Sequence, residues 1–245
     1  MGKWLRTRVL GSGSYGTVFL AISAAPGSWK KPIAMKSSRL ELSRSSQMEE
    51  HILKSFTLCP EIVQSHGCQI TNEQGLLVYN LLLEYAPHGT LSHLINKEPF
   101  LDTKATKVYI RALLRGLSCI HRRGFVHCDL KPQNILVFPP CPSHQDSEFY
   151  YQLKIADFGL SRTCDENFNE ENWRYKFRGT PIYMSPESLS LGKIEAPLEI
   201  WSLGCIVLEM ITGYNGSCWD FEKNTKDSLW TELGMQRLLE EMFYK

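Results

Sequence analysis

The sequence has no marked excess of charge of either sign and no long basic run. Its 27 Lys and Arg residues nearly balance 26 Asp and Glu residues, which leaves a formal net charge of +1. The longest basic runs are pairs such as Lys30-Lys31 and Arg122-Arg123. Because nucleic-acid binding by a folded domain requires a clustered basic surface, we expect no nucleic-acid partner.

Long apolar runs are also missing, which argues against a membrane protein. The most hydrophobic segment, 200–211, is interrupted by Glu209 and is shorter than the roughly 18 to 20 apolar residues of a membrane-spanning helix. The N-terminus, MGKWLRTRVL, lacks the apolar core of a signal peptide, and Arg6 disrupts a myristoylation pattern. We therefore expect no membrane association and a buried helix at 200–211.

Closely spaced cysteine pairs are absent as well. The eight cysteines stand at positions 59, 68, 119, 128, 141, 164, 205 and 218, and none forms a C-x-x-C pair. This spacing argues against the common zinc and redox motifs. We expect reduced, mostly buried thiols in a cytoplasmic protein, with the nucleus as a second location.

The first hundred residues indicate a strand-rich unit. Short β-branched and aromatic runs, separated by Gly, Pro, Ser and Asn, predict strands over 17–22, 32–38, 66–71 and 75–86. One helix is predicted over 45–56, where Met48, Ile52 and Phe56 recur every four residues.

The rest of the chain reads mostly as helix. Asp102 is the expected N-cap of a long amphipathic helix that ends at Gly124, and 138–148 is expected to form a surface loop. With 43% hydrophobic residues, the chain of 245 residues is long enough for two lobes. We predict an α+β fold with a small β lobe, residues 1–86, and a larger helical lobe, residues 87–245.

Gly11, Gly13 and Gly16 form a G-x-G-x-x-G motif that several kinds of site share. A dinucleotide fold needs a helix at the third glycine and an acidic residue about 20 positions later, but here a β-branched strand follows and that position is Lys36. A nucleoside-triphosphate P-loop needs Lys-Ser/Thr after its last glycine, and this chain has Thr17-Val18. The pattern favours a loop that covers phosphate groups.

Three more motifs follow in order: IAMK at 33–36, HCDLKPQN at 127–134 and DFG at 157–159. With the glycine motif they make the sequence resemble the eukaryotic protein kinase family from residue 5 to about residue 213. The resemblance implies a bilobal fold that transfers the γ-phosphate of ATP to protein hydroxyls with Mg²⁺ as cofactor.

The resemblance also implies roles for individual residues. The three glycines would cover the ATP phosphates, Lys36 would hold the α- and β-phosphates, and the metal ligands would be Asn134 and Asp157. Asp129 would accept the proton of the substrate hydroxyl, Lys131 would steady the γ-phosphate, and Thr180 would orient both. Between two candidate partners for Lys36, the E-x-x-I/L-L spacing selects Glu49 over Glu50.

An adenine pocket is implied by the run NLLLEYAPHGTL. The backbones of Glu84 and Ala86 would meet the edge of the base, with Leu83 behind it. A purine needs flat apolar walls, which would be Leu10, Val18, Ala34 and Leu136.

The substrate class is read from the later motifs. Lys131 and Thr180 resemble serine/threonine kinases, and GTPIYMSPES with HCD and WSLGC resembles plant mitogen-activated protein kinase kinase kinases of the MEKK type. This implies a protein substrate, a MAP kinase kinase, and we expect a monomer. Many kinases have an arginine at the position of Cys128, where it pairs with an activation-loop phosphate. We therefore expect activity not to depend on a phosphate clamped there, for example at Ser161 or Thr163.

Three departures from the family pattern bear on activity. Ser185 replaces alanine in A-P-E, a mild change, and Glu199 replaces an aspartate that bonds the catalytic-loop backbone, so its extra methylene is expected to loosen that contact. The chain stops before the family's last helices, which supply an arginine partner for Glu187, and a buried unpaired charge costs about 3 to 5 kcal/mol. A terminal helix is predicted from Leu229, Leu233, Leu238, Leu239, Met242 and Phe243. The alternative reading is a C-terminally short kinase-like module that binds partners without useful turnover.

Overall fold

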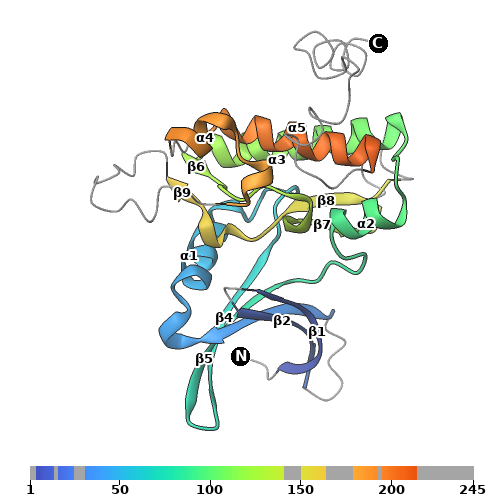
Figure 1. The fold of residues 1–245 in the computed structure, drawn as a ribbon. Coiled ribbons are helices and arrows are strands. Elements are labelled where there is room, and N and C mark those ends of the chain that lie inside the picture. Colours follow the sequence, from blue (N-terminus) through green and yellow to red (C-terminus); the bar gives the residue numbers. More distant parts are fainter. Residues whose placement is uncertain are drawn as a thin grey trace.

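A strand-rich lobe and a helical lobe meet at the middle of the molecule (Figure 1). The computed structural model describes residues 4–13, 16–24, 31–140, 150–163, 179–191 and 195–213. The predicted α+β, two-lobed fold is confirmed. The boundary after residue 86 and the terminal helix stay predictions, and the helix falls outside the described residues.

The strand-rich lobe is one antiparallel sheet of five strands in the order β1-β2-β3-β5-β4. The strands are β1 (Trp4–Gly13), β2 (Gly16–Ser23), β3 (Ile33–Arg39), β4 (Ser65–Glu73) and β5 (Leu76–Glu84). All four predicted strands are present, and β1 is additional. The glycine motif is therefore not a free loop but a hairpin, in which Gly11 pairs with Val18 and Gly13 with Gly16.

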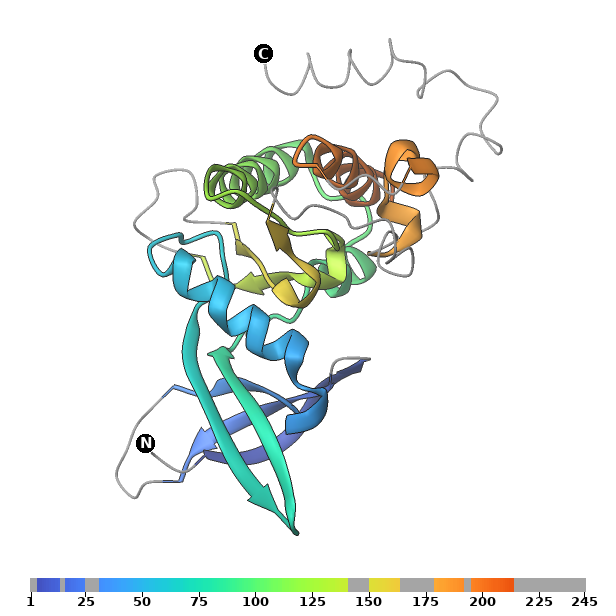
Figure 2. The same cartoon turned by 90° about the vertical axis from the view of Figure 1, so that its left-hand side faces the viewer.

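One helix covers a face of this sheet. It is α1 (Arg44–Leu53), extended by the short 3₁₀ turn η2 (Lys54–Phe56), and it lies beside the long β4–β5 hairpin (Figure 2). The predicted helix is confirmed, and Ile52 and Phe56 of the four-residue repeat are buried, whereas Met48 is 43% exposed. Glu49 and Leu53 are buried as well, and Glu49 faces a lysine of the sheet.

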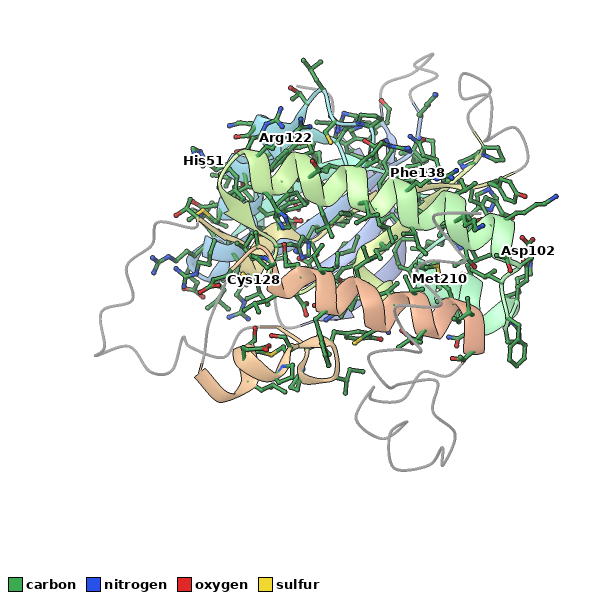
Figure 3. The ribbon with its side chains drawn as sticks, turned by 90° about the horizontal axis from the view of Figure 1, so that it is seen from above. His51, Asp102, Arg122, Cys128, Phe138 and Met210 are labelled. Carbon is green, nitrogen blue, oxygen red and sulfur yellow. The ribbon has the colours of Figure 1, made fainter. Side chains whose placement is uncertain are left out.

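The helical lobe is built on two long helices that lie side by side (Figure 3). They are α3 (Thr103–Arg122) and α5 (Leu198–Thr212). The Asp102 side chain accepts hydrogen bonds from the amides of Lys104 and Ala105 at 2.8 Å, so the predicted N-cap is confirmed. The amide of Leu101 donates to the carbonyl of Met210 at 2.9 Å and ties the start of α3 to the end of α5. In the part of the chain described here, no helix has the length and apolarity to cross a membrane.

Short elements between the lobes carry the HCDLKPQN and DFG motifs of the sequence. Two antiparallel pairs, β6 (Phe125–Val126) with β9 (Arg162–Thr163) and β7 (Ile135–Phe138) with β8 (Gln152–Ile155), flank the HCDLKPQN and DFG segments. The remaining helices are α2 (Leu91–Lys97) and α4 (Pro186–Leu191). The motif residues thus lie on short turns held by strands on either side.

Candidate active site

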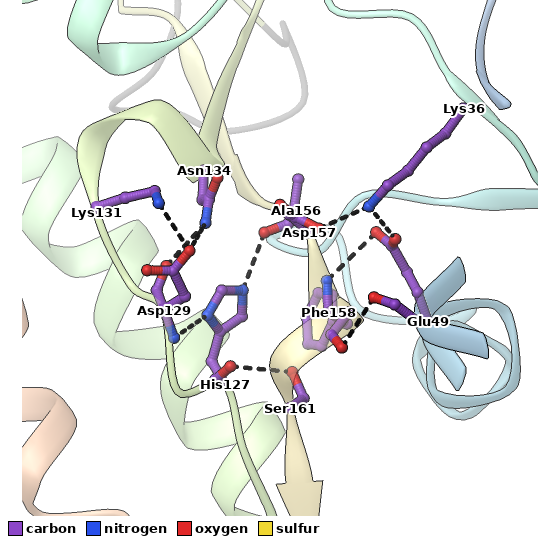
Figure 4. A network of polar contacts seen from close by, with 12 residues as sticks. Lys36, Glu49, His127, Asp129, Lys131, Asn134, Ala156, Asp157, Phe158 and Ser161 are labelled. Carbon is purple, nitrogen blue, oxygen red and sulfur yellow. Dashed lines mark hydrogen bonds and ion pairs between the residues drawn. The ribbon is translucent and has the colours of Figure 1, made fainter. Parts of the chain in front are cut away.

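Lys36 lies between two carboxylates that come from distant parts of the chain (Figure 4). Its ammonium donates to Glu49 Oε2 at 2.6 Å and to Asp157 Oδ1 at 2.7 Å. The other oxygen of Glu49 accepts a hydrogen bond from the Phe158 amide at 3.3 Å. Lys36 is on β3, Glu49 on α1, and Asp157 directly precedes the 3₁₀ turn η4 (Phe158–Leu160). These bonds join three elements from both lobes at one point.

Burial and charge act against each other in this group of three. Burial disfavours the ammonium, but the charges of Glu49 and Asp157 outweigh it and raise the pKa of Lys36. Burial likewise opposes ionisation of Asp157, but Lys36 prevails and lowers the pKa of Asp157. For the fully enclosed Glu49, burial dominates over the pull of Lys36 and raises its pKa. Lys36 therefore stays positively charged across the physiological pH range.

Asp129, Lys131 and Thr180 form a second hydrogen-bonded group. The Thr180 hydroxyl donates to Asp129 Oδ1 at 2.7 Å and accepts a hydrogen bond from Lys131 Nζ at 2.7 Å. Lys131 Nζ also lies 2.7 Å from Asp129 Oδ2. The side-chain amide of Asn134 donates to the Asp129 backbone carbonyl at 2.8 Å and to Oδ2 at 3.0 Å. The structure thus brings together the four residues that the resemblance assigned to catalysis.

His127 connects these two groups, and the sequence analysis did not single it out. It is fully buried, and its Nε2 lies 2.9 Å from the carbonyl oxygen of Ala156, next to Asp157. Its Nδ1 accepts a hydrogen bond from the Asp129 amide at 3.3 Å, so Nε2 carries the proton. The ring packs edge-on against Phe158 with centroids 4.9 Å apart. The only sequence signal was its place two residues before Asp129.

Glu199 holds the backbone of the catalytic loop, and the expectation that its extra methylene loosens this contact is wrong. Glu199 Oε1 accepts a hydrogen bond from the Cys128 amide at 2.9 Å, and Oε2 lies 2.7 Å from His121 Nε2. Cys128 has a φ of 70°, a left-handed conformation that a non-glycine residue keeps only when its surroundings fix it. The longer side chain still reaches the loop because His121, on α3, fixes its second oxygen.

The residues predicted to surround adenine come from both lobes. Leu10 and Val18 lie on β1 and β2, Ala34 lies on β3, and Leu136 lies on β7; all four are at least partly exposed, unlike core residues of these strands. Leu83 is buried and pairs with Ala34 in the sheet register.

The chain between the lobes, which would meet the edge of the base, is held by an ion pair that sequence reasoning missed. Lys154 on β8 donates to both carboxylate oxygens of Glu84 at 2.7 and 2.8 Å, and the Gln64 amide donates to Glu84 Oε1 at 2.8 Å. The Glu84 side chain is thereby engaged inside the protein. Ala86, two residues further on, is buried.

The three glycines of the hairpin differ in why each lacks a side chain. A Cβ on Gly16, which has a φ of 126°, would clash with the Ser37 carbonyl oxygen. A Cβ on Gly11 or Gly13 would meet no described atom within 4 Å. The fold therefore requires glycine at 16, whereas at 11 and 13 the open backbone suits close approach of a ligand.

The segments on either side of Asp157 and Thr180 bear on three expectations. Ser161 is buried and donates to the His127 carbonyl at 3.1 Å, so its hydroxyl is not presented for phosphorylation, whereas Thr163 is exposed. Ser185 is more than a mild replacement for alanine, because its hydroxyl accepts a hydrogen bond from the Ser188 amide at 3.1 Å and caps α4. Glu187 is exposed in the described part of the chain, so the expected cost of burying it unpaired does not arise there.

The donor set beside Asp129 suits a hard divalent cation. Asp157 offers a carboxylate whose side chain is 36% exposed. The amide nitrogen of Asn134 makes both of its hydrogen bonds, which leaves the amide oxygen as the atom for a ligand. Oxygen ligands of this kind are those that Mg²⁺ prefers, so the residues present fit the metal.

Glu49 on α1 holds Lys36 beneath the glycine hairpin, and Lys131 and Thr180 fix Asp129 opposite it. This arrangement defines a phosphate-transferring site of the protein kinase type. The comparisons agree: the model of the family "Protein kinase domain" matches residues 4–241, and this chain belongs to that family. Protein kinases use ATP with a divalent metal.

Its relatives include mitogen-activated protein kinase kinase kinases. Mitogen-activated protein kinase kinase kinase 20 of Arabidopsis thaliana is 36% identical over 214 residues, and the match covers 86% of this chain and 60% of the relative. The one numbered 17 from the same plant is 36% identical over 213 residues, covering 86% and 52%. The serine/threonine-protein kinase SSK22 of Saccharomyces cerevisiae is 30% identical, covering 86% and 16%. The chain thus spans little more than half the length of these two plant relatives.

Proposed function

We propose that this chain is the catalytic part of a serine/threonine protein kinase that acts as a MAP kinase kinase kinase. The observation that carries the proposal is the group at Asp129, where Thr180 and Lys131 hold the carboxylate on both oxygens. The plant, yeast and other relatives support the narrower assignment to MAP kinase kinase kinases.

The residues of the site divide the work of phosphate transfer among them. Asp129 accepts the proton of the attacking hydroxyl, and the hydrogen bonds from Thr180 and Asn134 keep its carboxylate aimed during that step. Lys36, kept charged by Glu49, binds the phosphates of ATP, and Lys131 meets charge that develops on the transferred group. Mg²⁺, held by Asp157 and Asn134, would neutralise phosphate charge when bound.

The substrate proposed from the relatives is a MAP kinase kinase. We also propose a monomer that resides in the cytoplasm, with the nucleus as a second location. The acceptor we propose is a serine or threonine hydroxyl carried on a protein chain.

The test is phosphorylation of a catalytically inactive MAP kinase kinase by the purified chain with Mg-ATP, followed by mapping of the modified residues. We expect transfer to serine or threonine in the activation segment of that substrate, faster than to a generic basic protein. Transfer to tyrosine, or equal rates on both substrates, would contradict the proposed specificity. A folded chain that binds ATP without transferring phosphate would instead support the binding-module reading.

A further inference from the structure

The segment that links α1 to the sheet crosses α3 at close range. After η2, residues 57–64 run over the middle of α3 before β4 begins, and Gly116 permits the approach. A Cβ on Gly116 would lie 2.9 Å from Ile155 Cδ1 and 3.3 Å from Glu61 Cβ. The crossing brings residues of the α1 connection against the next turn of the helix.

One turn beyond Gly116, two thiols meet. Cys59 and Cys119 lie near each other, since both line the same cavity and their side chains interact electrostatically. Both residues are buried, with 5% and 8% of their surfaces exposed, yet both line a surface cavity of about 520 Å³ together with Pro60 and Arg122. A small reagent that enters this cavity therefore meets both residues.

The surroundings of the two sulfur atoms differ in charge. Arg123 Nη1 donates to Cys119 Sγ at 2.9 Å, and the guanidinium lies over the Phe56 ring at 5.2 Å. Cys59 Sγ instead lies 3.8 Å from the carboxylate of Glu61. Burial and the contact with Cys119 raise the pKa of Cys59 to about 12, so Cys59 remains a thiol. The positive charge marks Cys119 as the sulfur that reacts first.

We propose that Cys59 and Cys119 are a modification site that forms a reversible intramolecular disulfide on exposure to a hydroperoxide. The Cys119 sulfur attacks the peroxide oxygen, breaks the O–O bond, and yields a sulfenic acid and an alcohol, or water when the oxidant is hydrogen peroxide. The Cys59 sulfur then displaces the hydroxyl group, which leaves as water with the thiol proton. Two thiols are oxidised to one disulfide, and one peroxide is reduced.

The crosslink would tie the connection after α1 to α3 of the helical lobe. Phe56, three residues before Cys59, packs against Phe158 with ring centroids 5.7 Å apart, so the tether lies close to the DFG turn. Because Lys36 and Glu49 are already paired in this arrangement, the disulfide fixes the arrangement that the site uses. The thiol pair itself does not depend on the proposed function, since its formation is read from chemistry and not from phosphate transfer.

The test is peptide mapping by mass spectrometry of the chain treated with sub-millimolar hydrogen peroxide and digested without reductant. We expect a linked peptide pair containing Cys59 and Cys119, which dithiothreitol removes, and a rise of the thermal midpoint by about 5 to 10 °C in the oxidised protein. The linked pair should vanish in Cys59→Ala and Cys119→Ala. It should persist in Cys68→Ala, the matched control on β4.

Arg123→Met adds a test of the charge argument, because it should slow linkage several-fold while the same peptides are joined. The proposal is overturned by three results: linkage of either cysteine to a different one, oxidation of Cys119 that stops at a sulfenic acid or a mixed disulfide, or no reaction. Phosphate-transfer assays on the same samples stay separate, so a chain without kinase activity could still show the disulfide.

Discussion

The ammonium of Lys36 contacts two carboxylates, Glu49 and Asp157, and the two differ in how firmly they can hold it. Glu49 is enclosed and holds the lysine from the α1 side, while Asp157 is partly exposed and holds it from the metal side. A ligand that draws Asp157 away leaves Glu49 as the remaining partner. The position of Lys36 during the reaction therefore rests on Glu49.

The first prediction compares the two adjacent glutamates of α1. Glu49→Gln should lower kcat/KM by about a hundredfold, because the neutral amide no longer fixes the charged lysine. Glu50→Gln is the matched control: Glu50 pairs with the exposed Lys54, a contact that contributes little, and the expected change is less than about twofold. Steady-state kinetics with Mg-ATP measure both. Equal losses in the two variants would contradict the assignment of Glu49.

The second prediction concerns the threonine that bridges Asp129 and Lys131. Thr180→Val keeps the shape but removes two hydrogen bonds to charged groups, and we expect kcat to fall by about ten- to a hundredfold. Thr180→Ser keeps the hydroxyl and should restore most of the rate. If the Val and Ser variants lose the same amount of activity, the methyl group matters and the hydrogen bonds do not.

At the level of elements, the glycines of the β1–β2 hairpin have different roles: the fold requires Gly16, whereas Gly11 and Gly13 face open space. Gly16→Ala places a Cβ against the Ser37 carbonyl at a positive φ and should destabilise the fold by about 1 to 3 kcal/mol. Gly11→Ala meets no described atom and should stay within about 0.5 kcal/mol in stability. Urea unfolding measures both variants. A Gly11 variant as unstable as the Gly16 variant would refute the distinction.

Sequence patterns predicted the elements well where periodicity or capping was local. The helix that follows Asp102 has its cap and apolar face within one window, and the strands are short β-branched and aromatic runs bounded by turn residues. Within α1 the four-residue repeat misplaced only Met48, which is exposed, while Ile52 and Phe56 are buried as the repeat indicated. Apolar periodicity does not report the buried Glu49, because its partner Lys36 lies on β3; the motif spacing selected it instead.

Contacts between distant residues account for what the sequence could not show in the site. The motif spacing named Asp129, Asn134 and Asp157, and these lie together in the structure. The Glu199 contacts with Cys128 and His121 join residues 71 and 78 positions apart, and the Lys154 pair with Glu84 spans 70. These partners become visible only when α3, α5 and β8 are placed in space.

At the scale of the whole molecule, one buried carboxylate makes stability depend on pH. Glu209 on α5 accepts a hydrogen bond from the Tyr183 hydroxyl at 2.9 Å, and burial, opposed by this bond, raises its pKa above the ordinary 4.5. Because the folded state binds the proton more tightly than the unfolded state, this residue's contribution falls as the pH rises from 4.5 through the raised value.

The prediction that follows is a variant more stable than the natural chain. Glu209→Gln keeps an acceptor for Tyr183 and removes the buried charge, so we expect its thermal midpoint to lie a few degrees higher at neutral pH. The gain should shrink as the pH falls toward 4.5, where Glu209 becomes protonated. Calorimetry at several pH values provides the measurement. A gain that grows on acidification, or a loss at neutral pH, would contradict this account.

The most direct test of the central claim is transfer of radiolabelled γ-phosphate from Mg-ATP by the purified chain and by its Asp129→Asn variant, with nucleotide binding measured on both. The account predicts transfer by the natural chain and its loss in the variant, with ATP still bound by both, because Asp129 accepts the proton and does not hold the nucleotide. Transfer that persists in the variant, or a folded natural chain that binds ATP and transfers nothing, would contradict it.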